Sequence, residues 1–257
     1  MKTLCTFLLL FILTGCSTSS SHSGSGGLSG NWQISLQRSE TNAVKNQSGF
    51  LMQSGESLSG ELLLTQTGCA GVGIVSGQVR GDSVSISVSQ NGQTINLTGT
   101  ASSAGSSMSG DYSLLASGCG NTQTGTWTAV RIASVSGSLN STFTSSLTPG
   151  VVIHFAGKVS QGDNTGQSNA PLTGSMTSSD SQPCYSNVNV VGQVSGTAVV
   201  LNLVAPDGTV LGAYQGTGTT DMTSISGQYS FFNVHSDVLG DCGGGDFGTA
   251  TIAVGSS

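Results

Sequence analysis

Apolar and polar residues alternate along two segments that share one plan. From Val84 to Gly99 the chain reads Val-Ser-Ile-Ser-Val-Ser-Gln-Asn-Gly-Gln-Thr-Ile-Asn-Leu-Thr-Gly, and a period of two is typical of strands with one buried face. Asn91-Gly92 between the two runs predicts a hairpin with a type I′ turn. Folding there pairs Val88 with Ile95, so the apolar faces of the two strands coincide.

The same plan returns about 115 residues later, at residues 199–214, with Pro206-Asp207-Gly208 as the turn. Further landmarks repeat as well: Met-Ser-Gly-Asp-Tyr-Ser at 108–113 corresponds to Ile-Ser-Gly-Gln-Tyr-Ser at 225–230. The chain therefore predicts two tandem domains, residues 28–133 and residues 134–257.

Each repeat contains eight candidate strands, separated mainly by short Gly- and Ser-rich turns. In the first repeat these are 31–37, 48–53, 57–65, 72–79, 83–89, 93–100, 108–116 and 122–132. In the second they are 137–144, 151–160, 172–177, 188–194, 198–204, 209–216, 224–234 and 248–254. We expect an all-β protein in which each repeat is an antiparallel eight-stranded meander that closes into a small barrel. A pair of β-sandwiches is the alternative.

The first 27 residues lie outside this pattern. Lys2 is followed by an apolar run that is too short to span a bilayer, which is typical of a signal peptide, here residues 1–15. Leu13-Thr14-Gly15-Cys16 resembles the lipobox of bacterial lipoproteins. The resemblance implies cleavage before Cys16, lipid on that residue and, with Ser17 after it, a place in the outer membrane. Residues 16–27 would form a flexible Ser/Gly tether. An ordinary secretory signal is the alternative.

The charge balance bears on possible partners. Removal of Lys2 with the signal leaves five Lys and Arg against twelve Asp and Glu, a net charge of −7. Such a chain is poorly suited to nucleic acid or anionic lipid head groups, so we expect no nucleic-acid partner and membrane attachment only through the N-terminal lipid.

Four cysteines remain after Cys5 leaves with the signal and Cys16 takes lipid. Cys69 and Cys184 are 115 residues apart, the same offset as the hairpins, whereas Cys119 and Cys242 each follow a hairpin. The duplication predicts the disulfides Cys69–Cys119 and Cys184–Cys242, one within each repeat. A zinc site is the alternative, but no Cys-x-x-Cys spacing supports it.

Gly30-Asn31-Trp32, at the start of the first strand, is similar to the Gly-x-Trp signature of the calycin barrels, the lipocalin and avidin group. The resemblance implies that Trp32 closes the base of a barrel and that Arg131, near the end of the last strand, lies across it. The resemblance does not extend beyond Trp32 and Arg131, because the lipocalin Thr-Asp-Tyr motif and the avidin tryptophan cluster are missing. Trp32, Trp127 and Arg131 are candidates either for ligand contact or for packing, and we expect the first repeat to carry whatever binding exists.

The densest polar cluster, His235, Asp237, Asp241 and Asp246, lies in the last long loop. Carboxylates on a Gly-rich loop are weak candidates for cation binding, but their spacing fits no known calcium motif, so we expect neither a metal nor a cofactor. His154 lies on the polar side of its strand, and no Gly-x-Ser-x-Gly elbow is present. We expect no enzymatic activity.

Two classes of function remain. One is a binding module for a small apolar molecule or a glycan. The other is a structural or adhesive protein of the cell envelope that has no ligand cavity. The barrel interior distinguishes them, because a dry interior packed by residues such as Val84, Ile86, Val88, Ile95 and Leu97 favours the structural class.

Overall fold

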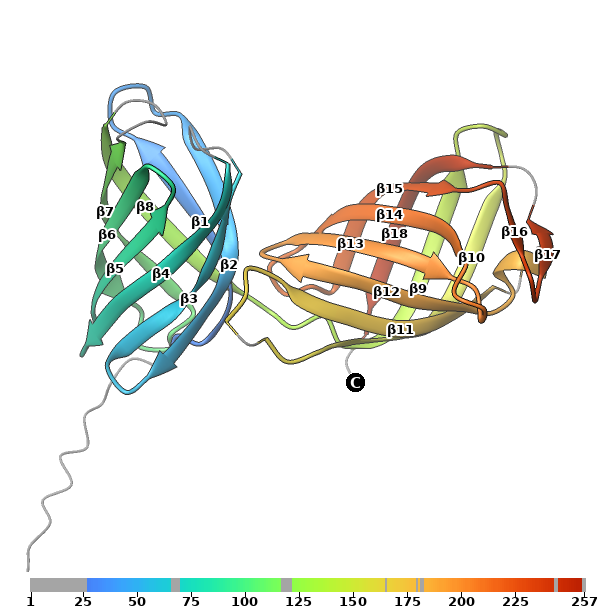
Figure 1. Ribbon diagram of the computed structural model, residues 1–257, viewed down its shortest axis with the longest axis horizontal. Coiled ribbons are helices and arrows are strands. Elements are labelled where there is room, and N and C mark those ends of the chain that lie inside the picture. Colours follow the sequence, from blue (N-terminus) through green and yellow to red (C-terminus); the bar gives the residue numbers. More distant parts are fainter. Residues whose placement is uncertain are drawn as a thin grey trace, which may run out of the picture.

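The computed structural model describes residues 27–65, 70–116, 122–164, 166–178, 180, 183–242 and 245–255. They form two closed antiparallel barrels that follow one another along the chain and lie side by side (Figure 1). This confirms the predicted all-β architecture of two tandem eight-stranded barrels. Within the described residues, no helix is long and apolar enough to cross a bilayer.

The first barrel is a plain meander in which each strand pairs with the next and β1 closes the ring by pairing with β8. Its strands are β1 (Gly30–Arg38), β2 (Val44–Ser54), β3 (Ser57–Leu64), β4 (Gly71–Arg80), β5 (Ser83–Gln90), β6 (Gln93–Ala101), β7 (Ser107–Ala116) and β8 (Gln123–Ile132).

The second barrel repeats this order, and β18 closes the ring by pairing with β9. Its strands are β9 (Gly137–Ser145), β10 (Val152–Gln161), β11 (Ala170–Ser178), β12 (Val188–Ser195), β13 (Ala198–Val204), β14 (Val210–Gly218), β15 (Ser224–Phe231) and β18 (Phe247–Val254). Outside the ring lie a short 3-10 helix, η1 (Pro183–Tyr185), and a hairpin of β16 (Val234–Ser236) and β17 (Gly240–Cys242).

The hairpin predicted around Asn91-Gly92 has the expected register, with Val88 opposite Ile95. Its turn differs from the expectation. Gly92 has a φ of +74°, but Asn91 does not adopt a left-handed conformation, so the turn is not type I′, which needs a positive φ at both positions. The apolar alternation was therefore sufficient to set the pairing.

Inward-facing side chains fill both barrels. In the first barrel one continuous cluster includes Trp32, Leu62, Ile86, Val88 and Trp127, each at most 2% exposed. In the second barrel, aromatic rings occupy much of the corresponding space. Phe143 is centred 4.9 Å from Tyr229 and 5.1 Å from Phe155. The distances between the rings are typical of packed aromatic cores.

Paired glycines let neighbouring strands approach closely at equivalent places in the two barrels. Gly99 lies opposite Gly110, and Gly216 lies opposite Gly227. A Cβ on Gly110 would lie 2.0 Å from the Thr98 carbonyl oxygen and 2.5 Å from the Gly99 Cα. Since no side chain fits there, the glycines allow the sheet to bend sharply enough to close.

A polar interface joins the barrels. The side-chain amide of Asn31 donates to the Gly196 carbonyl oxygen at 2.8 Å and accepts from the Gly196 N–H at 2.7 Å. Ser48 and Ser195 share a 2.9 Å hydrogen bond beside it. Gly196 has a φ of +56°, and a Cβ there would lie 2.3 Å from the Gln33 Oε1. A Cβ there would also lie 2.6 Å from the Ser48 Cβ, so a glycine at its tip lets the β12–β13 turn pack closely against the first barrel.

Phe50 explains why β2 breaks the alternation of a half-buried strand. Residues 47–51 are all buried, because one face of β2 covers the first core and the other meets the second barrel. Phe50 is 3% exposed and belongs to the apolar cluster of the second barrel, together with Ile132 and Val135. The two barrels thus share buried apolar surface as well as hydrogen bonds.

Replacing Asn31 with alanine is expected to loosen this interface. The change leaves the buried N–H and carbonyl of Gly196 unpaired, which costs about 1–3 kcal/mol. Small-angle X-ray scattering of the full chain should then show a broader distribution of interatomic distances, while the tryptophan fluorescence of the first barrel stays native. An unchanged distribution would show that Asn31 does not hold the barrels together.

Candidate functional site

The two tryptophans are core residues of the first barrel. Trp32 is fully buried and donates its indole N–H to the Leu28 carbonyl at 2.9 Å. Trp127 is 1% exposed and donates to the Thr98 carbonyl at 3.1 Å. Because each ring is buried and its one donor is satisfied within the barrel, the geometry favours the packing alternative over ligand contact.

Arg131 lies across Trp32, on the neighbouring strand. Its guanidinium carbon is 5.3 Å from the centre of the indole ring, and the guanidinium donates to the Gly27 carbonyl. Burial lowers the pKa of Arg131. The contact is a cation–π interaction that covers one end of the barrel, so Arg131 also acts in packing.

A cap made of η1 and the β16–β17 hairpin, joined by a disulfide, lies at one end of the second barrel (Figure 1). Cys184 on η1 is bonded to Cys242 on β17, which confirms the pairing predicted for the second repeat. Tyr185, next to this bond, stacks on Phe231 with ring centres 4.4 Å apart. The cap therefore ties the β16–β17 hairpin to the aromatic core. The partner prediction, Cys69–Cys119, lies outside the described residues, as does Cys16.

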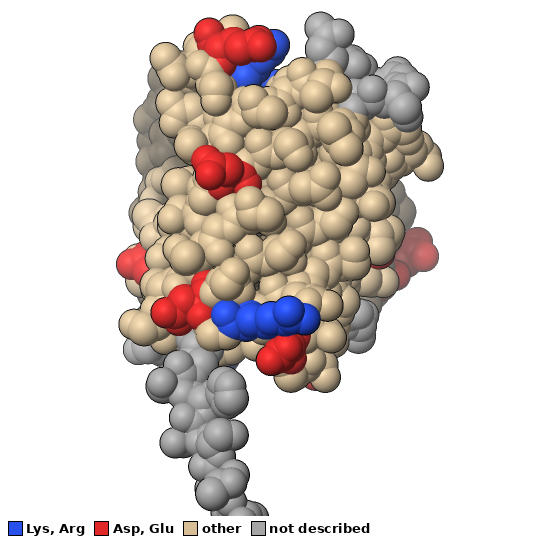
Figure 2. Space-filling view, turned by 90° about the vertical axis from the view of Figure 1, so that its left-hand side faces the viewer, with Lys and Arg blue, Asp and Glu red and all other residues tan. Residues whose placement is uncertain are grey.

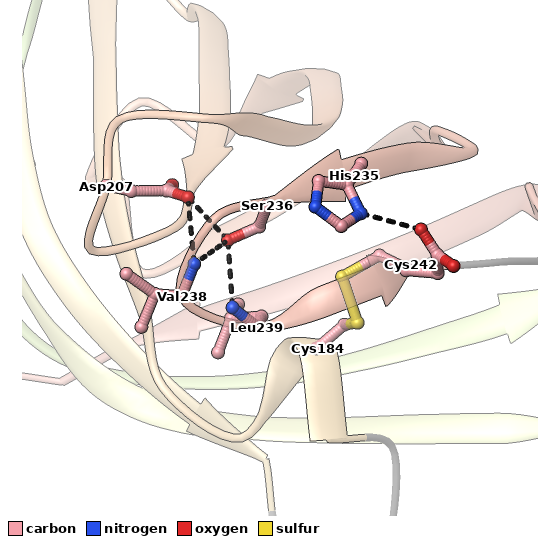
Figure 3. A network of polar contacts seen from close by, with 8 residues as sticks. Cys184, Asp207, His235, Ser236, Val238, Leu239 and Cys242 are labelled. Atoms are coloured by element: carbon pink, nitrogen blue, oxygen red, sulfur yellow. Dashed lines mark hydrogen bonds and ion pairs between the residues drawn. A yellow bond between two sulfur atoms is a disulfide. The ribbon is translucent and has the colours of Figure 1, made fainter.

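One predicted strand ends earlier than expected, because the chain leaves the barrel there to form the cap. The expected strand 224–234 ends as β15 at Phe231, and the chain then turns into β16. Polar contacts hold the hairpin in this position: the Ser236 hydroxyl donates to Asp207 at 2.6 Å, and the Val238 N–H also points to Asp207 (Figure 3). The Ser236 hydroxyl and the Thr209 N–H lower the pKa of Asp207. Asp207, which belongs to the Pro-Asp-Gly turn, thus anchors the cap as well as shaping its own hairpin.

The four candidate cation ligands do not converge. His235 Nδ1 pairs with Asp241 at 2.6 Å on the exposed hairpin. Asp246 instead accepts from the Tyr229 hydroxyl at 2.8 Å and the Ser145 hydroxyl at 2.7 Å. In the part of the chain that the structure describes, no group of three or more His, Cys, Asp or Glu is placed to hold a metal ion.

The His235–Asp241 pair predicts a pH dependence confined to the cap. The hydrogen bond to Asp241 and its negative charge raise the pKa of His235 above its ordinary value of 6.5. Since the folded pKa is raised, the stabilisation is fully present below about pH 6.5 and is lost as the pH rises through the folded pKa. Hydrogen-exchange protection of the hairpin amides should therefore be greater at pH 5.5 than at pH 8.5. In His235→Gln this difference should vanish; if it persists, another group is responsible.

The outer wall of the second barrel carries a groove with two exposed phenylalanines, which we call the aromatic groove. It has a volume of about 620 Å³ and crosses β13, β14, β15 and β18. The lining residues that are not buried are Ser146, Val200, Ala213, Gln215, Gln228, Ser230, Phe232, Phe247 and Thr249.

Strand register assembles the groove from residues far apart in the sequence. Gln228 lies between Gln215 on β14 and Thr249 on β18. In the next outward row, Ser230 lies between Ala213 and Phe247. Small side chains at the centre of this row leave the hollow, and the larger side chains border it.

Hydrogen bonds fix the backbone next to the two exposed phenyl rings. Phe247 is 53% exposed and Phe232 is 38% exposed. Phe247 follows Asp246, which is fixed by Tyr229 and Ser145, and the Phe232 N–H donates to the Leu211 carbonyl at 2.8 Å. The backbone of both residues is therefore tied to the barrel, and the rings remain accessible.

The sequence favoured the first repeat as the carrier of any binding, whereas the aromatic groove lies on the second barrel. Neither Phe232 nor Phe247 was among the residues predicted to take part in binding. A usable signal was present, because Phe247 occupies an outward position of an alternating strand. Large apolar residues at the polar positions of a strand point to a surface contact.

Charged groups are sparse on the surface. Figure 2 shows a face of the first barrel on which a few acidic and basic side chains lie scattered over a mostly uncharged surface. His154 is exposed, as predicted, and pairs with Asp180 at 3.3 Å.

Neither a comparison with protein-family models nor one with curated proteins finds a match for this chain.

Proposed function

We propose that this chain is a non-catalytic lipoprotein of the cell envelope, attached to the outer membrane through Cys16, whose barrels act through their outer surfaces as an adhesive or structural module. The observation that carries the proposal is the filling of both barrels by their own side chains. Val84, Ile86, Val88, Ile95 and Leu97 are each at most 2% exposed and belong to one apolar cluster.

This packing favours the adhesive or structural class over a carrier of a small apolar molecule. An eight-stranded barrel either fills its interior with side chains or holds one small ligand there. Here the large inward residues, including both tryptophans, take that space, so contacts with a partner fall to the outer walls.

The membrane attachment is supported by the resemblance of Leu13-Thr14-Gly15-Cys16 to a lipobox and by the Ser/Gly-rich stretch after it. One lipid-modified residue followed by a flexible tether would leave the two joined barrels free to reach neighbouring envelope components. The disulfide Cys184–Cys242 suits an oxidising compartment.

Two measurements on the full chain test the proposal. Globomycin treatment or the change Cys16→Ala should give an unprocessed or soluble species in place of a membrane-bound one. The soluble form of the Cys16→Ala protein, purified free of the signal peptide, should sediment with isolated envelope fragments and not with protein-free phospholipid vesicles. Unchanged mass and fractionation in Cys16→Ala would contradict the anchor, and failure to sediment with envelopes would contradict the adhesive role.

A further inference from the structure

We propose that the aromatic groove of the second barrel binds a neutral glycan. This inference rests on the proposed adhesive function and gives it a site and a ligand class. The groove's volume of about 620 Å³ falls in the range of roughly 300–1,000 Å³ that is usual for ligand pockets. It is an open groove on a barrel wall, a shape that admits a chain of sugar units without requiring a chain end.

The chemistry of the lining suits a sugar. Gln215 and Gln228 offer paired amide donors and acceptors, and Thr249 adds a hydroxyl in the same row. These groups match the hydroxyls of a sugar ring. Phe232 and Phe247 offer phenyl faces, whose negative quadrupole attracts the C–H groups of a sugar's apolar face. The groove combines both contacts within one patch.

The absence of charge in the lining selects neutral ligands. No Asp, Glu, Lys or Arg side chain belongs to the set of described residues that line the groove. An acidic polysaccharide would find no cation to pair with, and the net charge of −7 on the processed chain would repel it. A neutral glycan avoids both penalties.

The first barrel shows that the fold does not require these residues. Matching the register of β7 and β8 with that of β15 and β18 places Thr124 at the position of Phe247 and Asp111 at that of Gln228. The same match places Ser85 at the position of Val200 and Asn96 at that of Ala213. Leu115 occupies the position that is equivalent to Phe232.

The two barrels therefore form the same strands with different outer faces. On the first barrel the face carries polar groups, one carboxylate and Leu115, which is 52% exposed. On the second it carries two exposed phenyl rings and no charge. Because an exposed phenyl ring contributes little to barrel stability, Phe247 on the second barrel, where the first barrel has Thr124, points to contact with a ligand.

The test uses the full chain with Cys16→Ala, in affinity electrophoresis through gels that contain one soluble polysaccharide. Hydroxyethylcellulose, laminarin, galactomannan and dextran are the neutral probes, and polygalacturonate and alginate are the acidic ones. We expect at least one neutral glycan to retard the protein and neither acidic glycan to do so. Phe247→Thr, which installs the residue of the first barrel, should weaken binding about tenfold, the loss expected for one buried phenyl contact.

Val191→Thr is the matched control, because Val191 is 49% exposed on the same barrel but does not line the groove; it should bind as the parent does. Near-ultraviolet circular dichroism checks that each variant is folded. The inference is overturned if no neutral glycan retards the protein, if acidic glycans bind as well, or if Phe247→Thr binds like the parent. Sedimentation with envelopes in the absence of glycan binding would overturn this inference and leave the proposed function standing.

Discussion

Replacing Gly110 with alanine is expected to destabilise the first barrel by about 3 kcal/mol, because overpacking against rigid backbone leaves little room for relaxation. The new Cβ would lie 2.0 Å from the Thr98 carbonyl oxygen and 2.5 Å from the Gly99 Cα. Moving the Thr98 carbonyl also disturbs its hydrogen bond from the Trp127 indole N–H. The substitution therefore acts on strand pairing and on core packing together.

Urea unfolding followed by tryptophan fluorescence measures this effect directly, since Trp32 and Trp127, the chain's two tryptophans, both lie in the first barrel. Gly81→Asn is the matched control: Gly81 has a φ of +60° and open space around its Cβ position, and asparagine tolerates that conformation. The control should lose less than about 1 kcal/mol. Equal midpoints for Gly110→Ala and the parent would show that close strand approach is not needed for closure.

Removing the disulfide of the second barrel is expected to cost about 4 kcal/mol. The bond joins residues 58 positions apart, and the chain-entropy estimate for a loop of that length gives this value. In Cys184→Ala/Cys242→Ala the cap would also be held less firmly over the aromatic core, where Tyr185 stacks on Phe231. The loss should therefore fall on the second barrel.

Near-ultraviolet circular dichroism in the tyrosine region, measured along the same urea series, reports mainly on the second barrel, which holds three of the chain's four tyrosines; Tyr112 belongs to the first barrel and follows the tryptophan transition. We expect this transition to move to lower urea, while the tryptophan transition of the first barrel moves much less. A tyrosine transition that stays in place would mean that the cap adds nothing to stability. Equal shifts of both transitions would mean that the barrels unfold as one unit.

Much of the fold follows from the sequence because alternation and repetition reinforce each other. The pairing of Val88 with Ile95 and the equivalence of the two hairpins were predicted from the pattern alone. So were both rings of eight strands and the Cys184–Cys242 bond. Each depends on local periodicity or on the offset between the repeats, which are properties that a single sequence contains.

The remainder depends on contacts between distant segments. Residues 47–51 are buried on both faces only because the second barrel covers β2, and Asn31 meets Gly196 across 165 residues. The cap could not be predicted from the repeat, because its position depends on the hydrogen bond between Ser236 and Asp207 and on the disulfide between Cys184 and Cys242. For the same reason Phe247, which lies just before the predicted strand 248–254, shows no link to Ser230 in the sequence, whereas the register places the two residues side by side in the aromatic groove.

Native mass spectrometry of the purified Cys16→Ala protein, prepared without detergent, tests most directly whether the barrels are filled and partners are met on the outer walls. The account predicts a single species at the mass of the polypeptide with its disulfides, with no bound small molecule, even after incubation with excess fatty acid or sterol. A stoichiometric apolar ligand retained through purification or taken up from the added lipid would contradict it.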